Sequence, residues 1–528
     1  MKHITLGLLS FLCLLASCYE DKGNYDYTTV PEITFSNVKE TYDLLRGIDD
    51  LAFKPTITSS TEGEITADNP NYEFACILQP TSLYFDDNTK MHDLNPDKTK
   101  DFIYHFTEPV GTHKGVYSIK DKRTGVTTYY RFTVNLKSSV YEGWMILCNE
   151  GDDNRVRMDM VSVISRDEGR ISPVYKILNS SFPEEHNARQ IMFDHSMYST
   201  GDYLYLMSET GSYKLDKIGL TAEEKDNVAM GQFLSDLGDD VPIRFAAAGC
   251  GVPGASAHMM TTKNGNAYIN DLASFGSAYE FPANAAAELG APQYHVSPYI
   301  GVGMSRSETS VSSRAFLLYD TDNKRFMGWD ANKTTKLLYE LPESGATHIP
   351  FETGKDLVYM EGTRFGENSV FNVLQDADGS RSVLVIDLSD NQFRQTNYYE
   401  NITAEHFNEA EHFTFHSVYP YMFYSYKDKL YSYNFGTLSV NNTITLPGEE
   451  ITMVKIDLFK WLKPTSIPDN IKEQEHYILV GSYRQDATDD NGGILRMYKL
   501  DNATGKLNEV RKYEGFAKIV DVTYRERF

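Results

Sequence analysis

Cysteine and tryptophan are scarce in this sequence, with five and three residues among 528. No two cysteines have the Cys-x-x-Cys spacing, so neither a zinc site nor a disulfide framework is indicated. We expect Cys76, Cys148 and Cys250 to be buried thiols that pack as small apolar side chains. Because carbohydrate binders commonly expose tryptophan platforms, the shortage of Trp favours a peptide ligand over a glycan.

Basic residues are outnumbered as well. The chain has 50 Lys and Arg against 74 Asp and Glu, a net charge of −24. A field of this sign repels phosphate backbones, so we expect no nucleic-acid partner. A length of 528 residues is too great for one ordinary hydrophobic core, so two or more domains are expected.

The sequence has a single long apolar run, at its N-terminal end. Residues 4–15 follow Lys2 and lead into Ala16, Ser17 and Cys18, a pattern typical of a secretory signal too short to span a bilayer. Leu15-Ala16-Ser17-Cys18 resembles the lipobox of bacterial lipoproteins, which implies cleavage before Cys18 and acylation of its thiol. The alternative is an ordinary secretory signal with an incidental Cys. We expect residues 1–17 to be a signal peptide.

The segment after Cys18 is acidic and polar, and residues 18–30 are expected to form a tether. Residues 18–27 closely resemble the mature start of the PKD-like family lipoproteins of Bacteroidetes. In that family, acids after the acylated Cys look like a surface-export signal, and Glu20 and Asp21 fit. The resemblance implies a lipid anchor in the outer membrane, with the protein facing the outside of the cell.

Residues 31–138 show the period-2 alternation of β-strands, which predicts a small β-sandwich. Alternation is clear in residues 33–35, 53–55, 72–78 and 102–106, and residues 115–120 and 127–134 flank the turn at residues 121–125. This last hairpin resembles the PKD-like repeats, in which Gly-x-Tyr precedes an Asp-containing turn. The resemblance implies an immunoglobulin-like sandwich.

Residues 139–528 carry a loose repeat of apolar strand, acidic or glycine turn, and apolar strand. We place its units at residues 144–163, 191–215, 257–279, 314–341, 356–388, 413–446 and 477–510. The spacing of roughly 55 residues predicts a β-propeller of about seven blades with long loops. The count could also be six or eight. The fold class is therefore all-β.

Two further elements are expected within the propeller. The strand at residues 519–524 is expected to close the ring by pairing with a strand from its beginning. Residues 223–237 are predicted to form a short helix, and residues 285–289 a single helical turn.

Common enzyme signatures are absent: the sequence has no HExxH, GxSxG, P-loop or Rossmann fingerprint. His412 and His416 lie four residues apart, which in a strand is about 13 Å and too far for both to bind one metal. The Asp-rich segments 376–380 and 486–492 are expected to be hairpin turns, with calcium binding as the alternative. We predict no cofactor and no metal site.

Isolated basic, His and Tyr residues are the best candidates for contact with a ligand, because propellers bind ligands at the loop face around the central channel. The predicted set is Tyr198, Arg244, His258, Arg314, Arg364, His416, Tyr419 and Arg484. Each member taken singly also fits a structural ion pair or a packing role.

The family resemblance implies an accessory lipoprotein of a SusC/SusD-type TonB-dependent uptake system. Its partners would be a SusC-like transporter, a SusD-like lipoprotein and an extracellular ligand. Oligopeptides or proteins and ferric siderophores are the expected ligands, and no catalysis is expected. The alternatives are a surface hydrolase on a propeller scaffold and a scaffold subunit of the transporter that binds no ligand.

Overall fold

The computed structural model describes residues 30–46, 49–79, 92–106, 108–165, 169–178, 181–195, 202–216, 220–248, 257–271, 278–285, 293–304, 313–333, 335–366, 368–459 and 468–526. The chain divides into two compact units, the N-terminal unit Met1–Lys137 and the C-terminal unit Ser138–Phe528. Strands dominate both units, so the predicted all-β class is confirmed. Among the described residues, no helix combines the length and the apolar character needed to cross a membrane.

The N-terminal unit consists of three sheets. The first sheet contains β1 (Ile33–Ser36), β4 (Thr56–Ser59) and β5 (Gly63–Glu64). The second contains β2 (Thr41–Leu45), β10 (Thr127–Lys137), β9 (Gly111–Asp121), β6 (Tyr72–Gln79) and β7 (His92–Asp93). The third pairs β3 (Asp50–Phe53) with β8 (Phe102–His105). The predicted hairpin is the antiparallel pair β9–β10. The expected strand at residues 53–55 is wrong in its bounds, because β3 ends at Phe53.

A single aromatic core joins these sheets. The ring of Phe53 lies 4.9 Å from that of Tyr117 and 5.1 Å from that of Phe132, between centroids. Cys76 is buried in the same core, as predicted for a small apolar side chain.

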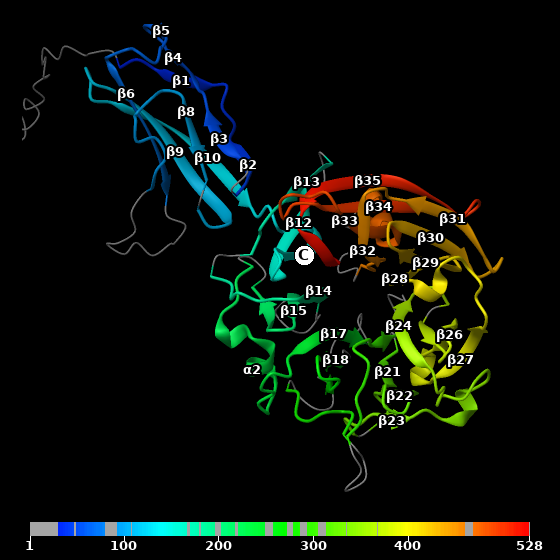
Figure 1. Ribbon diagram of the computed structural model, residues 1–528. Helices are drawn as coiled ribbons and strands as arrows, with labels where there is room; N and C mark the ends of the chain where they lie inside the picture. Colours follow the sequence, from blue (N-terminus) through cyan, green and yellow to red (C-terminus); the bar gives the residue numbers. More distant parts are fainter. Residues whose placement is uncertain are drawn as a thin grey trace, which may run out of the picture. The chain divides into compact units, whose positions relative to one another are not determined.

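The described part of the C-terminal unit forms seven sheets, which Figure 1 shows following one another around a ring. Sheet 1 contains β36 (Lys518–Arg525), β11 (Gly143–Glu150), β12 (Arg155–Ser165) and β13 (Arg170–Val174); sheet 2 contains β14 (Ala188–His195), β15 (Asp202–Ser208) and β16 (Ser212–Leu215); sheet 3 contains β17 (Pro242–Ala248), β18 (Ala257–Thr262) and β19 (Ala267–Asp271). In sheets 2 and 3 the strands are consecutive in sequence.

The remaining four sheets have four strands each. Sheet 4 contains β20 (Gly301–Val302), β21 (Ala315–Asp320), β22 (Arg325–Asp330) and β23 (Tyr339–Glu340); sheet 5 contains β24 (Asp356–Thr363), β25 (Ser369–Gln375), β26 (Arg381–Asp387) and β27 (Arg394–Tyr399); sheet 6 contains β28 (His412–Phe415), β29 (Tyr421–Tyr426), β30 (Lys429–Asn434) and β31 (Ser439–Thr445); sheet 7 contains β32 (Glu449–Lys455), β33 (Ile478–Arg484), β34 (Gly493–Asp501) and β35 (Lys506–Phe516). The Asp-rich segments 376–380 and 486–492 connect β25 to β26 and β33 to β34, which favours the hairpin interpretation of both.

The ring closes as the sequence predicted. The last strand, β36, pairs antiparallel with β11, the first strand of the unit, and sets Tyr524 opposite Trp144 and Val522 opposite Ile146. Hydrophobic clusters fill each gap between neighbouring sheets, including the gap between sheet 7 and sheet 1. Cys148 is buried in that closing cluster, whereas Cys250 lies outside the described residues.

Short helical segments connect some strands: η1 (Glu224–Asp226), α2 (Val228–Gln232), η2 (Glu343–Gly345), η3 (Ser389–Asn391), η4 (Phe407–Glu409), α3 (Asp469–Lys472) and η6 (Glu473–His476). The expected continuous helix at residues 223–237 is wrong. The backbone of Asn227 is extended, and its side chain caps α2 by accepting N–H bonds from Ala229 and Met230. Phe233 then bridges to Tyr279, which ends the helix. The expected turn at residues 285–289 lies mostly outside the described residues.

Candidate ligand-binding site

A cavity of about 280 Å³ lies where the innermost strands of the C-terminal unit converge. Its walls come from β14, β17, β24, β28, β32 and β36 together with the segment around β20, so every sheet contributes. These strands alternate side chains between two faces, which brings residues far apart in sequence to one place. The cavity is the candidate binding site.

Glu361 is the central acid of this cavity. It lies on β24, two residues after Tyr359, so both side chains share one face of the strand. The Thr414 hydroxyl donates to its Oε1 at 3.1 Å and the Phe415 N–H donates to its Oε2 at 3.0 Å. Burial raises the pKa of Glu361 to about 8, and these hydrogen bonds only partly oppose the effect. Near neutral pH this carboxyl group is therefore largely protonated.

Lys455 carries a positive charge on the wall formed by β32. Its Nζ lies 2.8 Å from Asp521 Oδ1 and 3.6 Å from Asp457 Oδ1. Burial lowers the pKa of Lys455, but the two neighbouring carboxylates outweigh this and leave the pKa raised. Both acids are also held by the protein, since Asp521 accepts the Ile191 N–H and Asp457 accepts the Tyr524 N–H. Lys455 is thus a paired charge.

Arg244 differs from the other basic residues of the cavity. It lies on β17 and is half-buried, with its guanidinium 5.4 Å from the centre of the Tyr299 ring. No ion pair or hydrogen bond joins its side chain to any described residue. Arg189, which also lines the cavity, is instead paired with Glu209. Arg244 therefore supplies the cavity with a cation that has no acidic partner among the described residues.

Aromatic rings surround these charged groups. The Tyr299 ring meets that of Tyr359 edge-on at 5.1 Å, and Tyr359 lies 5.7 Å from Phe413 in a near-parallel arrangement. Burial raises the pKa of Tyr359 well above its ordinary value, so its hydroxyl stays neutral. His412, at the start of β28, is also neutral because burial lowers its pKa to about 4. Among the described residues, the site combines Arg244, a cation without an acidic partner, with the paired charges of Lys455, Asp457 and Asp521 and with apolar and neutral polar side chains.

Among the described members of the predicted ligand-binding set, Arg244 is the one that lines this cavity. His258 lies between sheets 2 and 3, with its Nε2 3.5 Å from Asp194 Oδ2, and burial lowers its pKa. The Arg314 side chain is bonded to Asp271 of sheet 3. Both residues therefore hold neighbouring sheets together.

Two other predicted residues, Arg364 and His416, directly follow strands β24 of sheet 5 and β28 of sheet 6. Arg364 pairs with Glu475 at 2.6 Å and donates to the Phe459 carbonyl. His416 is buried and accepts the Val418 N–H, and burial lowers its pKa to about 3. Both side chains therefore already have partners within the protein.

The last three predicted residues are Tyr419, Arg484 and Tyr198. Tyr419 is half-buried beside the His416 ring, at 5.1 Å between centroids. Arg484 is exposed at the end of β33, next to Glu449. Tyr198 lies outside the described residues.

Sequence reasoning missed Glu361, Lys455, Asp457 and Asp521. Their signal was present, because each is a charged residue inside an otherwise apolar strand segment, as in Val454-Lys455-Ile456 and Val520-Asp521-Val522. A charge in such a segment must be paired or must face a polar space. The sequence alone could not show that these three segments, around Glu361, Lys455–Asp457 and Asp521, meet.

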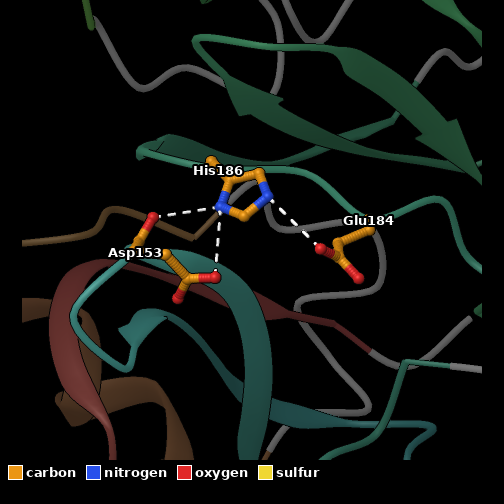
Figure 2. A group of neighbouring side chains, drawn as sticks. All are labelled: Asp153, Glu184 and His186. Carbon is orange, nitrogen blue, oxygen red and sulfur yellow. Dashed lines mark hydrogen bonds and ion pairs between the residues drawn. The ribbon is translucent and has the colours of Figure 1, made fainter.

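A second group of polar side chains lies at the rim of sheets 1 and 2. Figure 2 shows the His186 ring between Asp153 and Glu184, with Nε2 3.5 Å from Glu184 Oε1. Nδ1 donates to the Asp153 carbonyl at 3.0 Å, so this nitrogen is not available to a metal ion. Both acids are exposed, and we interpret the group as surface ion pairing.

The comparisons with known proteins concern the fold. The PKD-like family matches residues 18–181, so the resemblance of this part of the chain to the PKD-like family is confirmed. No curated protein matches the chain.

Solved structures with a similar trace have 8–12% identity to this chain. A quinonprotein alcohol dehydrogenase-like protein from Bacteroides thetaiotaomicron has 12% identity and a TM-score of 0.41, covering 94% of this chain and 100% of its own. A Lactobacillus plantarum protein has 12% identity and a TM-score of 0.44, covering 73% of this chain and 100% of its own. The C-terminal WD40 domain of Sif2 has 8% identity and a TM-score of 0.36, covering 73% of this chain and 84% of its own. At these values the likenesses carry no information on activity.

Proposed function

We propose that this protein is a lipid-anchored surface protein that binds a small or peptide-like ligand in the central cavity of a seven-bladed propeller. It would serve a SusC/SusD-type TonB-dependent uptake system of Bacteroidetes, with the immunoglobulin-like N-terminal unit between the anchor and the propeller. The observation that carries the binding role is Arg244, a cation with no acidic partner among the described residues in a chain of net charge −24.

Arg244 is informative because the other two basic residues that line the cavity, Lys455 and Arg189, each pair with acidic side chains. Lys455 has two carboxylates within 4 Å, and Arg189 has one. A half-buried cation without an acidic partner can still gain from a ligand carboxylate or catecholate oxygen, which would form charge-assisted hydrogen bonds with it. The cavity volume of about 280 Å³ is at the lower end of small-molecule sites, which favours a short peptide over a whole protein.

Replacing Arg244 by Ala is expected to weaken ligand binding about tenfold or more, because a charge-assisted hydrogen bond contributes roughly 1.5–3 kcal/mol. Calorimetry of the purified protein without its signal and tether, titrated with peptide pools and ferric siderophores, is the measurement. Arg189→Ala is the matched control, since it removes a cavity arginine that Glu209 already neutralises. Equal losses in both variants would contradict a special role for Arg244.

The anchor is tested separately. Cys18→Ala is expected to release the protein from membranes or leave it unprocessed, because the acylated thiol would be lost. Metabolic labelling with palmitate, followed by membrane fractionation, measures this. Label that persists in the Cys18→Ala variant would rule out this site of lipidation.

A surface hydrolase remains the second candidate. A carboxyl group with a raised pKa inside a cavity, as at Glu361, is the kind of group that acts as a general acid. Product analysis during the same titrations separates the two functions, because conversion of any probe would reject a binding-only role. If the protein binds none of the probes, the scaffold role would be favoured instead.

A further inference from the structure

The charges around the cavity favour a bound anion only when Glu361 is neutral. Lys455 with Asp457 and Asp521 carries a net charge of −1, and Arg244 brings the total to zero. An ionised Glu361 would bring the total charge of these groups to −1 before any anion binds. A bound anion and an ionised Glu361 would then repel each other in a space of about 280 Å³.

The protein holds Glu361 in one orientation. Ile456 N–H donates to the Thr414 hydroxyl at 3.0 Å, so the hydroxyl proton is left to point at Glu361 Oε1. The Phe415 N–H fixes the other oxygen. Both oxygens of Glu361 therefore accept bonds from the wall, and the Tyr359 side chain is a further hydrogen-bond partner of the carboxyl group.

The aromatic rings define a second property of the occupant. Tyr299 lies beneath the Arg244 guanidinium, and Tyr359 and Phe413 continue the apolar wall from it. A molecule that places a carboxylate on Arg244 would therefore lay an adjoining apolar group against these rings. The C-terminal residue of a short peptide has both parts.

Resting on the proposed function, we infer that the cavity takes the terminal carboxylate of a short apolar peptide on Arg244, and that Glu361 selects for it by holding a proton. An ammonium group in place of the carboxylate would be repelled by Arg244, and a neutral amide would accept a weaker hydrogen bond without charge assistance. The bound carboxylate would strengthen the hold of Glu361 on its proton, so binding and protonation support each other.

The pKa directions around the cavity agree with this coupling. Glu361, at about 8 without ligand, would be raised further by a neighbouring anion. The groups that face it are Tyr359 on its own strand, Thr414 and Phe415 from β28, and Lys455 from β32. Tyr359 and Lys455 have raised pKa values and His412 has a lowered one, so none of these three changes charge near pH 8.

The experiment uses N-acetyl-L-phenylalanine as the probe, because it has an ionised carboxylate at every pH tested and no amine. Its affinity for the wild-type protein is expected to be constant below pH 7 and to fall about tenfold by pH 9.5. Calorimetry at pH 8.5 in buffers of different ionisation enthalpy should show uptake of a fraction of one proton on binding. The neutral N-acetyl-L-phenylalaninamide should bind at least tenfold more weakly at pH 6.5.

Glu361→Gln is expected to bind the probe with no pH dependence between 6.5 and 9.5, because the amide mimics the protonated acid. Glu400→Gln, which alters an exposed acid that is not among the residues lining the cavity, is the matched control and should keep the wild-type profile. Proton uptake in the wild type is an independent readout should Glu361→Gln fail to fold.

The outcomes separate the two proposals. Binding of the probe without proton uptake at pH 8.5, or equal binding of the amide, would overturn the inference. Binding of a ferric siderophore that is lost in Arg244→Ala, with no binding of the probe, would overturn the inference and leave the proposed function standing. Binding of no probe would overturn both.

Discussion

A chain that ends before Lys518 is expected to lose the folded C-terminal unit altogether. β36 supplies the innermost strand of sheet 1 and buries Ile519, Val522 and Tyr524 completely or nearly so. Burying each such side chain contributes roughly 1.5–3 kcal/mol, so three together approach the whole stability of a typical domain, about 5–15 kcal/mol. Removing β36 also leaves the hydrogen-bonding edge of β11 open.

Circular dichroism and the yield of soluble protein measure this loss. Deleting residues 30–137 instead should cost far less, because that unit has its own core. Point variants provide a finer test. Val522→Ala truncates a fully buried side chain and should lower the free energy of unfolding more than Val510→Ala, which truncates one that is 41% exposed. Equal tolerance of the two deletions would contradict ring closure by β36.

The second large effect is expected at Arg157, which joins sheet 1 to sheet 7. The side chain is buried and binds Glu150 at 3.1 Å, Asp159 at 2.9 Å and Asn491 at 2.9 Å. Arg157→Ala would leave two buried carboxylates without this partner, and breaking a buried ion pair in this way costs about 3–5 kcal/mol. Urea denaturation at pH 8 measures the fall in the free energy of unfolding.

Arg155→Ala is the control for this prediction. Arg155 also pairs with Glu150, at 2.6 Å, but its side chain is 48% exposed, so a loss of at most about 1 kcal/mol is expected. Burial already raises the pKa of Asp159. Without Arg157 that pKa rises further, so the stability lost by the Arg157→Ala variant should be smaller at pH 5 than at pH 8. A loss that does not depend on pH would show that the cavity left by the side chain, and not the orphaned charge, is responsible.

The alternation of apolar and polar residues was enough to predict the all-β class and the pairing of the last strand. It was not enough for the shortest elements, such as the two residues of β20, or for β17, which precedes the predicted unit at residues 257–279. Residues 223–237 look helical in isolation. Pairing of Phe233 with Tyr279 overrides that tendency, and a contact so far along the chain has no local signal.

The candidate site was harder to predict for a related reason. Arg244, Arg314 and Arg364 are alike in sequence, each an isolated basic residue beside a strand. Arg314 and Arg364 differ from Arg244 only because Asp271 and Glu475 reach them from distant segments. Charge pairing across sheets therefore decides which arginine stays available to a ligand.

The position of Asp521 ties the cavity to the strand that closes the ring. This residue belongs to β36, yet it neutralises Lys455 and forms part of the cavity wall. A chain without β36 therefore has neither a closed ring nor the closest acid of Lys455. Ring closure and the charge balance of the cavity are thus set by the same strand.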